Sequence, residues 1–125
     1  MKIPLVSGFL EDDVYEQRLT DKFMNDVICN EDHFYHRIAK SLSSKKIEPV
    51  VYYMSQEKIE KKFTHKYGHS IIRVPAKKIN FLHEPIVYSP QLVNNIKKNY
   101  EICNFVSGYY VMYKIPDMFD YTVFK

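Results

Sequence analysis

Short apolar runs alternate with amphipathic stretches along the chain. "KIPLVS" (2–7) is typical of a strand, although its proline weakens the ladder. Residues 47–54 are rich in Val and Tyr and contain few polar positions, as expected of a strand buried on both faces. "SIIRVP" (70–75) and "EICNFVS" (101–107) have the same character. The pattern therefore predicts four strands.

The segment before the second strand carries helix signals. Asn30 is a suitable N-cap, and Glu31 and Asp32 follow where the dipole of a first turn favours acids. Apolar residues then recur at i, i+4 and i+8, namely Phe34, Ile38 and Leu42. We expect an amphipathic helix that buries this stripe. Residues 9–28 are compatible with either a helix or an ordered long loop.

Two further helices are expected between the later strands. Residues 55–66 can form one, which Gly68 would end with a left-handed residue. After a loop over 76–88, Ser89 as N-cap and Pro90 at the first helical position begin the next. Asp117 can cap a last helix that reaches the C-terminus.

This alternation of strands and helices predicts an α/β domain, a Rossmann-like parallel sheet with helices on both faces, over residues 1–125. Ligands in such sheets bind at the carboxyl ends of the strands, near the switch in strand order. Those ends lie near Ser7-Gly8, Ser55, Pro75 and Ser107-Gly108.

Composition agrees with one domain that has a sizeable core: 125 residues, 46% of them hydrophobic, with a net charge of +3. That charge is too small to predict nucleic-acid binding. The first residues contain no secretory signal, so we expect a cytoplasmic protein. Cys29 and Cys103 lie too far apart for a CxxC motif, and buried thiols are the favoured interpretation. Cys29 precedes the expected helix, a position that lowers a thiol pKa, but no base pattern accompanies it.

The histidines form no recognisable metal motif. His33 and His36 lie three apart on the expected helix, yet no HExxH pattern or third ligand accompanies them, which favours exposed side chains and no metal. His65 and His69 are interpreted as polar loop residues.

The basic middle of the chain has two interpretations. Four lysines of the second expected helix could contact phosphates, but intervening glutamates favour a solvated helix face. Those lysines are Lys58, Lys61, Lys62 and Lys66. Arg73 is either a charge at a strand edge, which we favour, or a phosphate contact.

An ordered set of these motifs resembles the N-terminal half of a retaining GT-B glycosyltransferase of the family-4 type. "IAKSL" (38–42) fits the end of that family's first helix, and Gly68 with "IIRVP" (71–75) fits its third element. "EICNFVS" (101–107) fits the last strand of the half. The resemblance covers nearly the whole chain.

The resemblance implies an acceptor-side domain of a sugar-transfer enzyme, inactive alone. The family binds its nucleotide-sugar donor mainly through a second domain with two Glu, for which 125 residues leave no room. We therefore expect a truncated gene product or one subunit of a split enzyme, with no cofactor of its own. Its partners would be a donor-binding chain and a saccharide or lipid-linked acceptor, the latter at the inner membrane surface. Exposed aromatic residues in 108–113 and 118–124 would favour self-association.

The family's site positions can be transferred in part. Cys29 and Asn30 stand where the family has a Gly-Gly pair, and Asn104 and Val106 stand where it has two His. His83 is a candidate acid/base or sugar ligand. The expected substrate-binding residues are Ser7, Gly8, Asn30, Asn104, Ser107 and Gly108. The departures leave open a small non-catalytic Rossmann-like binding protein.

Overall fold

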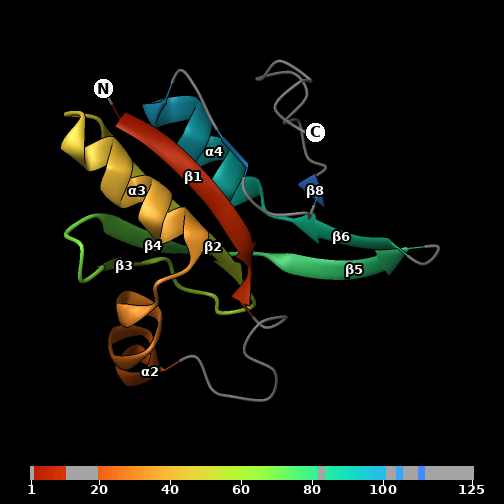
Figure 1. Ribbon diagram of the computed structural model, residues 1–125. Helices are drawn as coiled ribbons and strands as arrows, with labels where there is room; N and C mark the ends of the chain where they lie inside the picture. The colour runs from red at the N-terminus through yellow and green to blue at the C-terminus, as the bar shows by residue number, and fades with distance from the viewer. Residues whose placement is uncertain (1, 11–19, 82–83, 101–103, 106–109, 112–125) are drawn as a thin grey trace.

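A five-stranded open sheet organises the part of the chain that the computed structural model describes, namely residues 2–10, 20–81, 84–100, 104–105 and 110–111 (Figure 1). The strand order is β3-β4-β2-β1-β7. The strands are β1 (Lys2–Phe9), β2 (Glu48–Ser55), β3 (Lys61–Thr64), β4 (Ser70–Pro75) and β7 (Asn104–Phe105).

Four of these strands run parallel. β1 pairs in parallel with β2 and β7, and β2 pairs in parallel with β4, while β3 is antiparallel to β4. The chain thus moves from β1 to β2 to β4 on one side and places β7 on the other side of β1. An α/β fold with a mostly parallel open sheet is therefore confirmed, and the predicted strands at 2–7, 47–54 and 70–75 are found with small shifts in their ends.

The predicted second helix over 55–66 is wrong. This stretch forms a turn and the edge strand β3, in which Phe63 is buried beneath the sheet while Lys62 is exposed. Ile59, within the expected helix, is 66% exposed. Lysines on an edge strand discourage pairing with a second chain, which is a sufficient reason for the basic character of this segment. Lys61 Nζ also contacts Asp21 Oδ2 at 2.6 Å.

The expected loop over 76–88 is a hairpin. β5 (Lys77–Phe81) and β6 (Glu84–Tyr88) pair antiparallel, and β8 (Tyr110–Val111) adds to β6 in parallel to make a second, three-stranded sheet. Figure 1 shows this hairpin projecting beyond the end of the main sheet.

Three α-helices pack around the main sheet in the described residues. They are α2 (Asp21–Asp26), α3 (Phe34–Ser44) and α4 (Pro90–Asn99), and a short 3-10 helix, η1 (Ile28–Asn30), links the first two. The predicted start of α4 is confirmed, because the Ser89 hydroxyl accepts a hydrogen bond from Leu92 N at 3.3 Å. The start of α3 lies later than predicted, since its N-cap is His33 rather than Asn30 and its first turn contains no acid.

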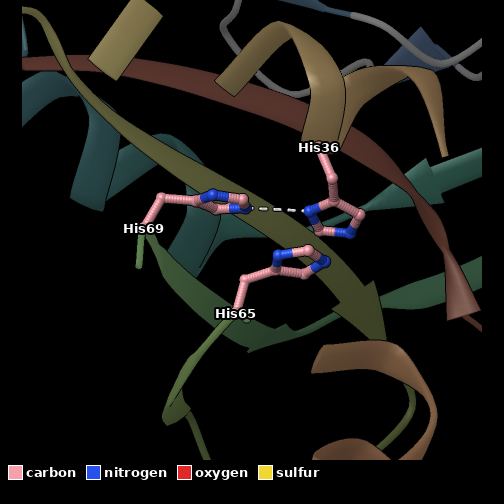
Figure 2. Close-up of side chains that lie close together, drawn as sticks. All are labelled: His36, His65 and His69. Carbon is pink, nitrogen blue, oxygen red and sulfur yellow. Dashed lines mark hydrogen bonds between the residues drawn. The ribbon is translucent and has the colours of Figure 1, made fainter. Parts of the chain in front are cut away.

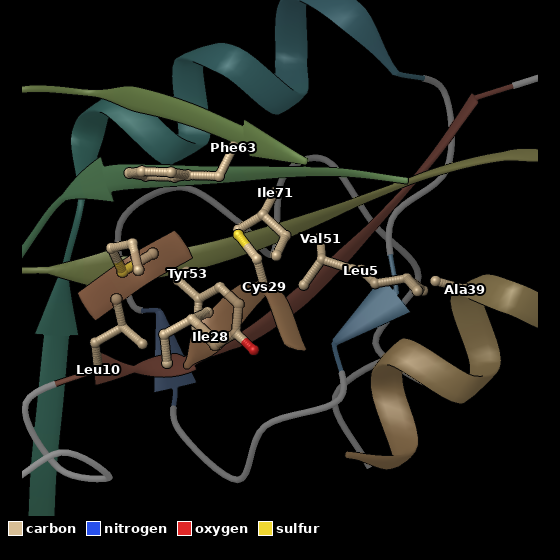
Figure 3. Close-up of a cluster of buried hydrophobic side chains, with 10 residues drawn as sticks. Leu5, Leu10, Ile28, Cys29, Ala39, Val51, Tyr53, Phe63 and Ile71 are labelled. Atoms are coloured by element: carbon tan, nitrogen blue, oxygen red, sulfur yellow. The ribbon is translucent and has the colours of Figure 1, made fainter. Parts of the chain in front are cut away.

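Alternating residues of the strands build a core on each face of the sheet. Val50, Tyr52 and Met54 of β2 face α4, whereas Val51 and Tyr53 face α2 and α3. The α2/α3 face is drawn in Figure 3. Its buried members are Leu5, Leu10, Met24, Ile28, Cys29, Ala39, Val51, Tyr53, Phe63 and Ile71. A run with apolar residues on both faces thus gives a doubly covered strand, as predicted for β2.

The buried face of α3 differs from the predicted apolar stripe. Phe34 is 50% and Ile38 36% exposed, whereas Ala39 and His36 are fully buried. The helix is therefore rotated so that a histidine, rather than two large apolar residues, faces the sheet. Burial of a polar ring requires hydrogen-bond partners, and these lead to the candidate site.

Several predictions lie outside the described residues: the helix after Asp117, the exposed aromatic segments and Cys103. Within the described residues, no helix is both long enough and apolar enough to cross a bilayer.

Candidate functional site

Three of the predicted ligand contacts, Ser7, Gly8 and Asn104, lie in the strands that meet where strand order reverses. β1 continues to Phe9, so Ser7 and Gly8 belong to the strand and are buried rather than forming an open turn. The backbone of Asn104 in β7 pairs with Leu5 of β1, so β7 directs its carboxyl end toward the same edge of the sheet as β1.

Asn30, another predicted site residue, lies away from this edge. Asn30 ends η1, and its side-chain amide donates to the carbonyls of Asn25 and Asp26 at 3.0 and 3.1 Å. Its side chain therefore caps the preceding turns. Ser107, Gly108 and His83 lie outside the described residues.

Three buried histidines form a cluster in the described interior. His36 comes from the first turn of α3, and His65 and His69 flank the turn between β3 and β4 (Figure 2). Their side chains are 0%, 2% and 4% exposed, respectively. One ring nitrogen from each lies within 4.8 Å of the other two. The expectation of an exposed side chain is therefore wrong for His36, although it is confirmed for His33, whose side chain is 57% exposed. His65 and His69, interpreted as polar loop residues, are buried beside the β3–β4 turn.

Local structure fixes the two hairpin histidines. His65 N donates to His69 O at 2.9 Å, and Gly68 N donates to His65 O at 2.8 Å, which closes a tight turn. Gly68 has φ +97°, so its predicted left-handed conformation is confirmed, but in a hairpin turn rather than at a helix end. Lys66 N donates to Cys29 O at 2.8 Å and holds the turn against η1.

The protonation of His65 follows from its neighbours. Its Nε2 lies 2.7 Å from the Glu31 carbonyl oxygen, which can only accept, so Nε2 carries the proton. Its Nδ1 accepts a hydrogen bond from Tyr67 N at 3.1 Å and therefore carries the lone pair. His65 is thus held as one neutral tautomer.

His36 connects the His69 ring to Tyr53 of β2 through hydrogen bonds. Its Nδ1 lies 2.8 Å from His69 Nε2, and its Nε2 lies 2.9 Å from the Tyr53 hydroxyl. The Tyr53 hydroxyl donates to Glu31 Oε2 at 3.4 Å. Since the hydroxyl proton is directed to this carboxylate, His36 Nε2 donates to Tyr53 and His69 Nε2 donates to His36 Nδ1. A hydrogen-bonded chain therefore runs from His69 to the Glu31 carboxylate.

Burial keeps all three rings neutral. Desolvation, with repulsion from His65 and His69, lowers the pKa of His36 to about 3. Desolvation, with repulsion from His65, lowers the pKa of His69 to about 4. Desolvation also lowers the pKa of His65, although the hydrogen bond to the Glu31 backbone raises it in part. The cluster therefore offers uncharged imidazole nitrogens, the form that binds transition metals.

The rings stack rather than radiate from a common centre. His36 and His65 are 4.0 Å apart between centroids with planes 16° apart, and His65 and His69 are 4.6 Å apart at 14°. A ring nitrogen directs its lone pair within its own plane, so the three lone pairs do not converge as they stand. The arrangement is that of a hydrogen-bonded cluster of stacked rings.

Two other candidate residues, Arg73 and Cys29, are buried in the described interior. Arg73, expected at a strand edge, is 3% exposed within β4, which β2 and β3 flank, and its guanidinium lies 5.6 Å from the Phe63 ring centroid. Cys29 is buried as predicted, but burial and the nearby Glu31 charge raise its pKa, opposite to the helix-terminus expectation. The structure thus gives Cys29 no feature of a reactive thiol.

The chain was also compared with known families, curated proteins and solved structures, and none of the three comparisons gave a match.

Proposed function

We propose that the chain is an acceptor-side, Rossmann-like domain of a GT-B glycosyltransferase, acting together with a donor-binding domain. The observation that carries the proposal is the reversal of strand order at β1, with β2 and β4 on one side and β7 on the other. In open α/β sheets the crevice at such a switch point is the usual ligand site. Here it would receive the acceptor at the ends of β1 and β7.

The positions of the resembling motifs support the same proposal. "IAKSL" lies in α3 and "IIRVP" lies in β4, in the order that the resemblance requires. Ser7 and Gly8 lie at the carboxyl end of β1, next to the switch point. An acceptor there would be oriented by backbone groups and small side chains, so that transfer depends on positioning and on stabilisation of the leaving diphosphate by the donor-binding domain.

One observation favours a second candidate, a non-catalytic binding domain of the same fold. Asn30, which stands in place of a phosphate-approaching glycine, is used as a structural cap. The first turn of α3 has a histidine N-cap that makes no side-chain capping bond. Neither feature assists a diphosphate, so this domain would bind a saccharide without transferring a sugar.

Sugar transfer by the assembled enzyme tests the proposal. We would first search the DNA after the Lys125 codon and the neighbouring genes for a segment that encodes a Rossmann-like domain with two Glu eight residues apart. The protein that this segment encodes is then purified together with this chain. Radiolabelled nucleotide hexoses are then supplied with saccharide and lipid-linked acceptors, the latter in anionic vesicles. We expect label in an acceptor only when both domains are present. If the assembled pair only binds acceptor and transfers nothing, the second candidate replaces the first.

The switch-point location is tested separately on this chain by amide chemical-shift mapping with saccharide acceptors. We expect shifts at Ser7 and Gly8, and their loss in Gly8→Phe, which fills the end of β1. The matched control is Ser43→Phe on the exposed last turn of α3, which should leave the shifts unchanged. Circular dichroism confirms that both variants fold. Shifts confined to other elements would refute this location.

A further inference from the structure

We propose that His36, His65 and His69 form a binding site for one divalent transition-metal ion, for which Zn²⁺ is the test ion. Three imidazoles are a frequent ligand set for zinc, and here they are brought together within 4.8 Å in a buried position. The proposal does not depend on the proposed function, because it concerns the interior between α3 and the β3–β4 turn.

The outer nitrogens of two rings are already fixed as they are in metal sites. A metal-bound histidine usually donates its other N–H to a nearby oxygen, which sets the tautomer and the ring orientation. His36 Nε2 has the Tyr53 hydroxyl at 2.9 Å, and His65 Nε2 has the Glu31 carbonyl at 2.7 Å. Nδ1 of each ring remains as the ligand atom.

The third ring supplies Nε2, which faces His36. His69 Nδ1 is buried and has no hydrogen-bond partner among the described residues. When an ion binds, the proton between His36 and His69 moves to this nitrogen, so all three rings stay neutral and no proton is released. In the bound form this nitrogen would be a buried N–H with no acceptor among the described residues, a cost that the metal–nitrogen bonds must exceed.

Binding requires a small rearrangement of the stack. Zn–N bonds of about 2.0–2.1 Å in a tetrahedral site place two nitrogens about 3.3 Å apart. His36 Nδ1 and His69 Nε2, now 2.8 Å apart, must therefore separate slightly. The His65 ring must also turn from its stacked position, which breaks its hydrogen bond from Tyr67 N. These changes involve side-chain torsions only.

The donor set defines the class of ion. Neutral imidazoles suit Zn²⁺, Co²⁺, Ni²⁺ and Cu²⁺, whereas Mg²⁺ and Ca²⁺ prefer oxygen ligands. Glu31 Oε2 lies 3.9 Å from His36 Nε2 and supplies a nearby negative charge. Because the site is buried, the ion would join α3 to the β3–β4 turn and act structurally.

The experiment uses the untagged chain after treatment with a chelator. Calorimetric titration with Zn²⁺ should show one saturable site, and the melting temperature should rise with Zn²⁺ concentration. Co²⁺ should give the intense visible absorption of a low-coordinate site. His65→Gln and His69→Gln, which remove direct ligands, should each weaken binding by more than the roughly 10–100-fold that loss of an outer-shell partner costs. The matched control is His33→Gln, which removes an exposed histidine 3.4 Å from the same Glu31 and should leave the affinity unchanged.

The proposal is overturned if Zn²⁺ shows no saturable binding, or if either cluster variant binds as tightly as the parent chain. Should both variants fail to fold, the parent chain with Co²⁺ still decides. An intense spectrum supports the site, and the weak spectrum of hydrated Co²⁺ refutes it.

Discussion

Acidification of the metal-free protein is expected to destabilise it, because acid protonates histidines that the fold keeps neutral. The folded-state pKa values, about 3 for His36 and about 4 for His69, lie below the ordinary value of 6.5. A lowered histidine pKa stabilises the fold above the unfolded-state pKa, and this stabilisation is lost as the pH falls from there toward the folded-state value. The loss should therefore begin near neutrality.

The magnitude follows from the unfolded state. Both folded-state pKa values lie at or below about 4, so neither ring takes up a proton in the folded protein between about pH 7 and about pH 5. In the unfolded chain each ring is protonated over this range, with a pKa near 6.5. The free energy of unfolding therefore falls by about 2 kcal/mol for each ring. Together the two rings cost about 4 kcal/mol, a large part of the roughly 5–15 kcal/mol that stabilises a typical domain. His65 acts in the same direction.

Urea unfolding followed by circular dichroism, in chelator at pH values between 7 and 5, measures this loss. Asp21 and Asp32 do not interfere, because their pKa values are lowered from 3.8 and their contributions are lost only at lower pH. His36→Gln should lower the stability at neutral pH yet remove about half of the acid loss. His33→Gln, at an exposed position, should leave the loss intact. Unfolding that is independent of pH across this window would refute the reasoning.

Two further predictions concern the backbone. Gly68→Ala should lower the free energy of unfolding by about 1 kcal/mol, because its φ of +97° is unfavourable for alanine although a Cβ would meet nothing within 4 Å. Gly68→Asn should lower it less. Equal urea midpoints for the parent chain and both variants would contradict this prediction. Ser89→Ala should cost about 1–2 kcal/mol in the same assay through loss of the α4 cap. Ser41→Ala on exposed α3 is the control, and an equally small effect at both serines would refute the cap's role.

The strands at the centre of the sheet could be predicted, because a short continuous apolar run is typical of a strand that is buried on both faces. Residues 47–54 contain apolar side chains for both faces, and the fold uses both. β3 could not be predicted in the same way, since Ile59 and Phe63 are four residues apart and imitate a helical stripe. Only pairing with β4 determines that Phe63 faces inward while Ile59 does not.

The histidine cluster was missed because its members meet only through tertiary packing. His36 and His69 are separated by 33 positions, and a helix rotation that buries His36 instead of Phe34 cannot be read from apolar periodicity. A partial signal was present: His65 and His69 bracket a Tyr-Gly turn, so they must face each other across a hairpin. Interpreting that pair as one unit would have indicated a site.

Ser89 also helps to anchor the β5–β6 hairpin to the main sheet. Its hydroxyl donates to Pro75 O at 2.7 Å, and Ala76 N donates to Ser55 O at 2.7 Å, so both ends of the β5–β6 excursion are anchored at the end of β4. The main sheet and α4 therefore do not rely on the length of the intervening segment. We expect an insertion between these two anchors to leave the main sheet and α4 in place, whereas deletion of β6 would remove the strand with which β8 pairs.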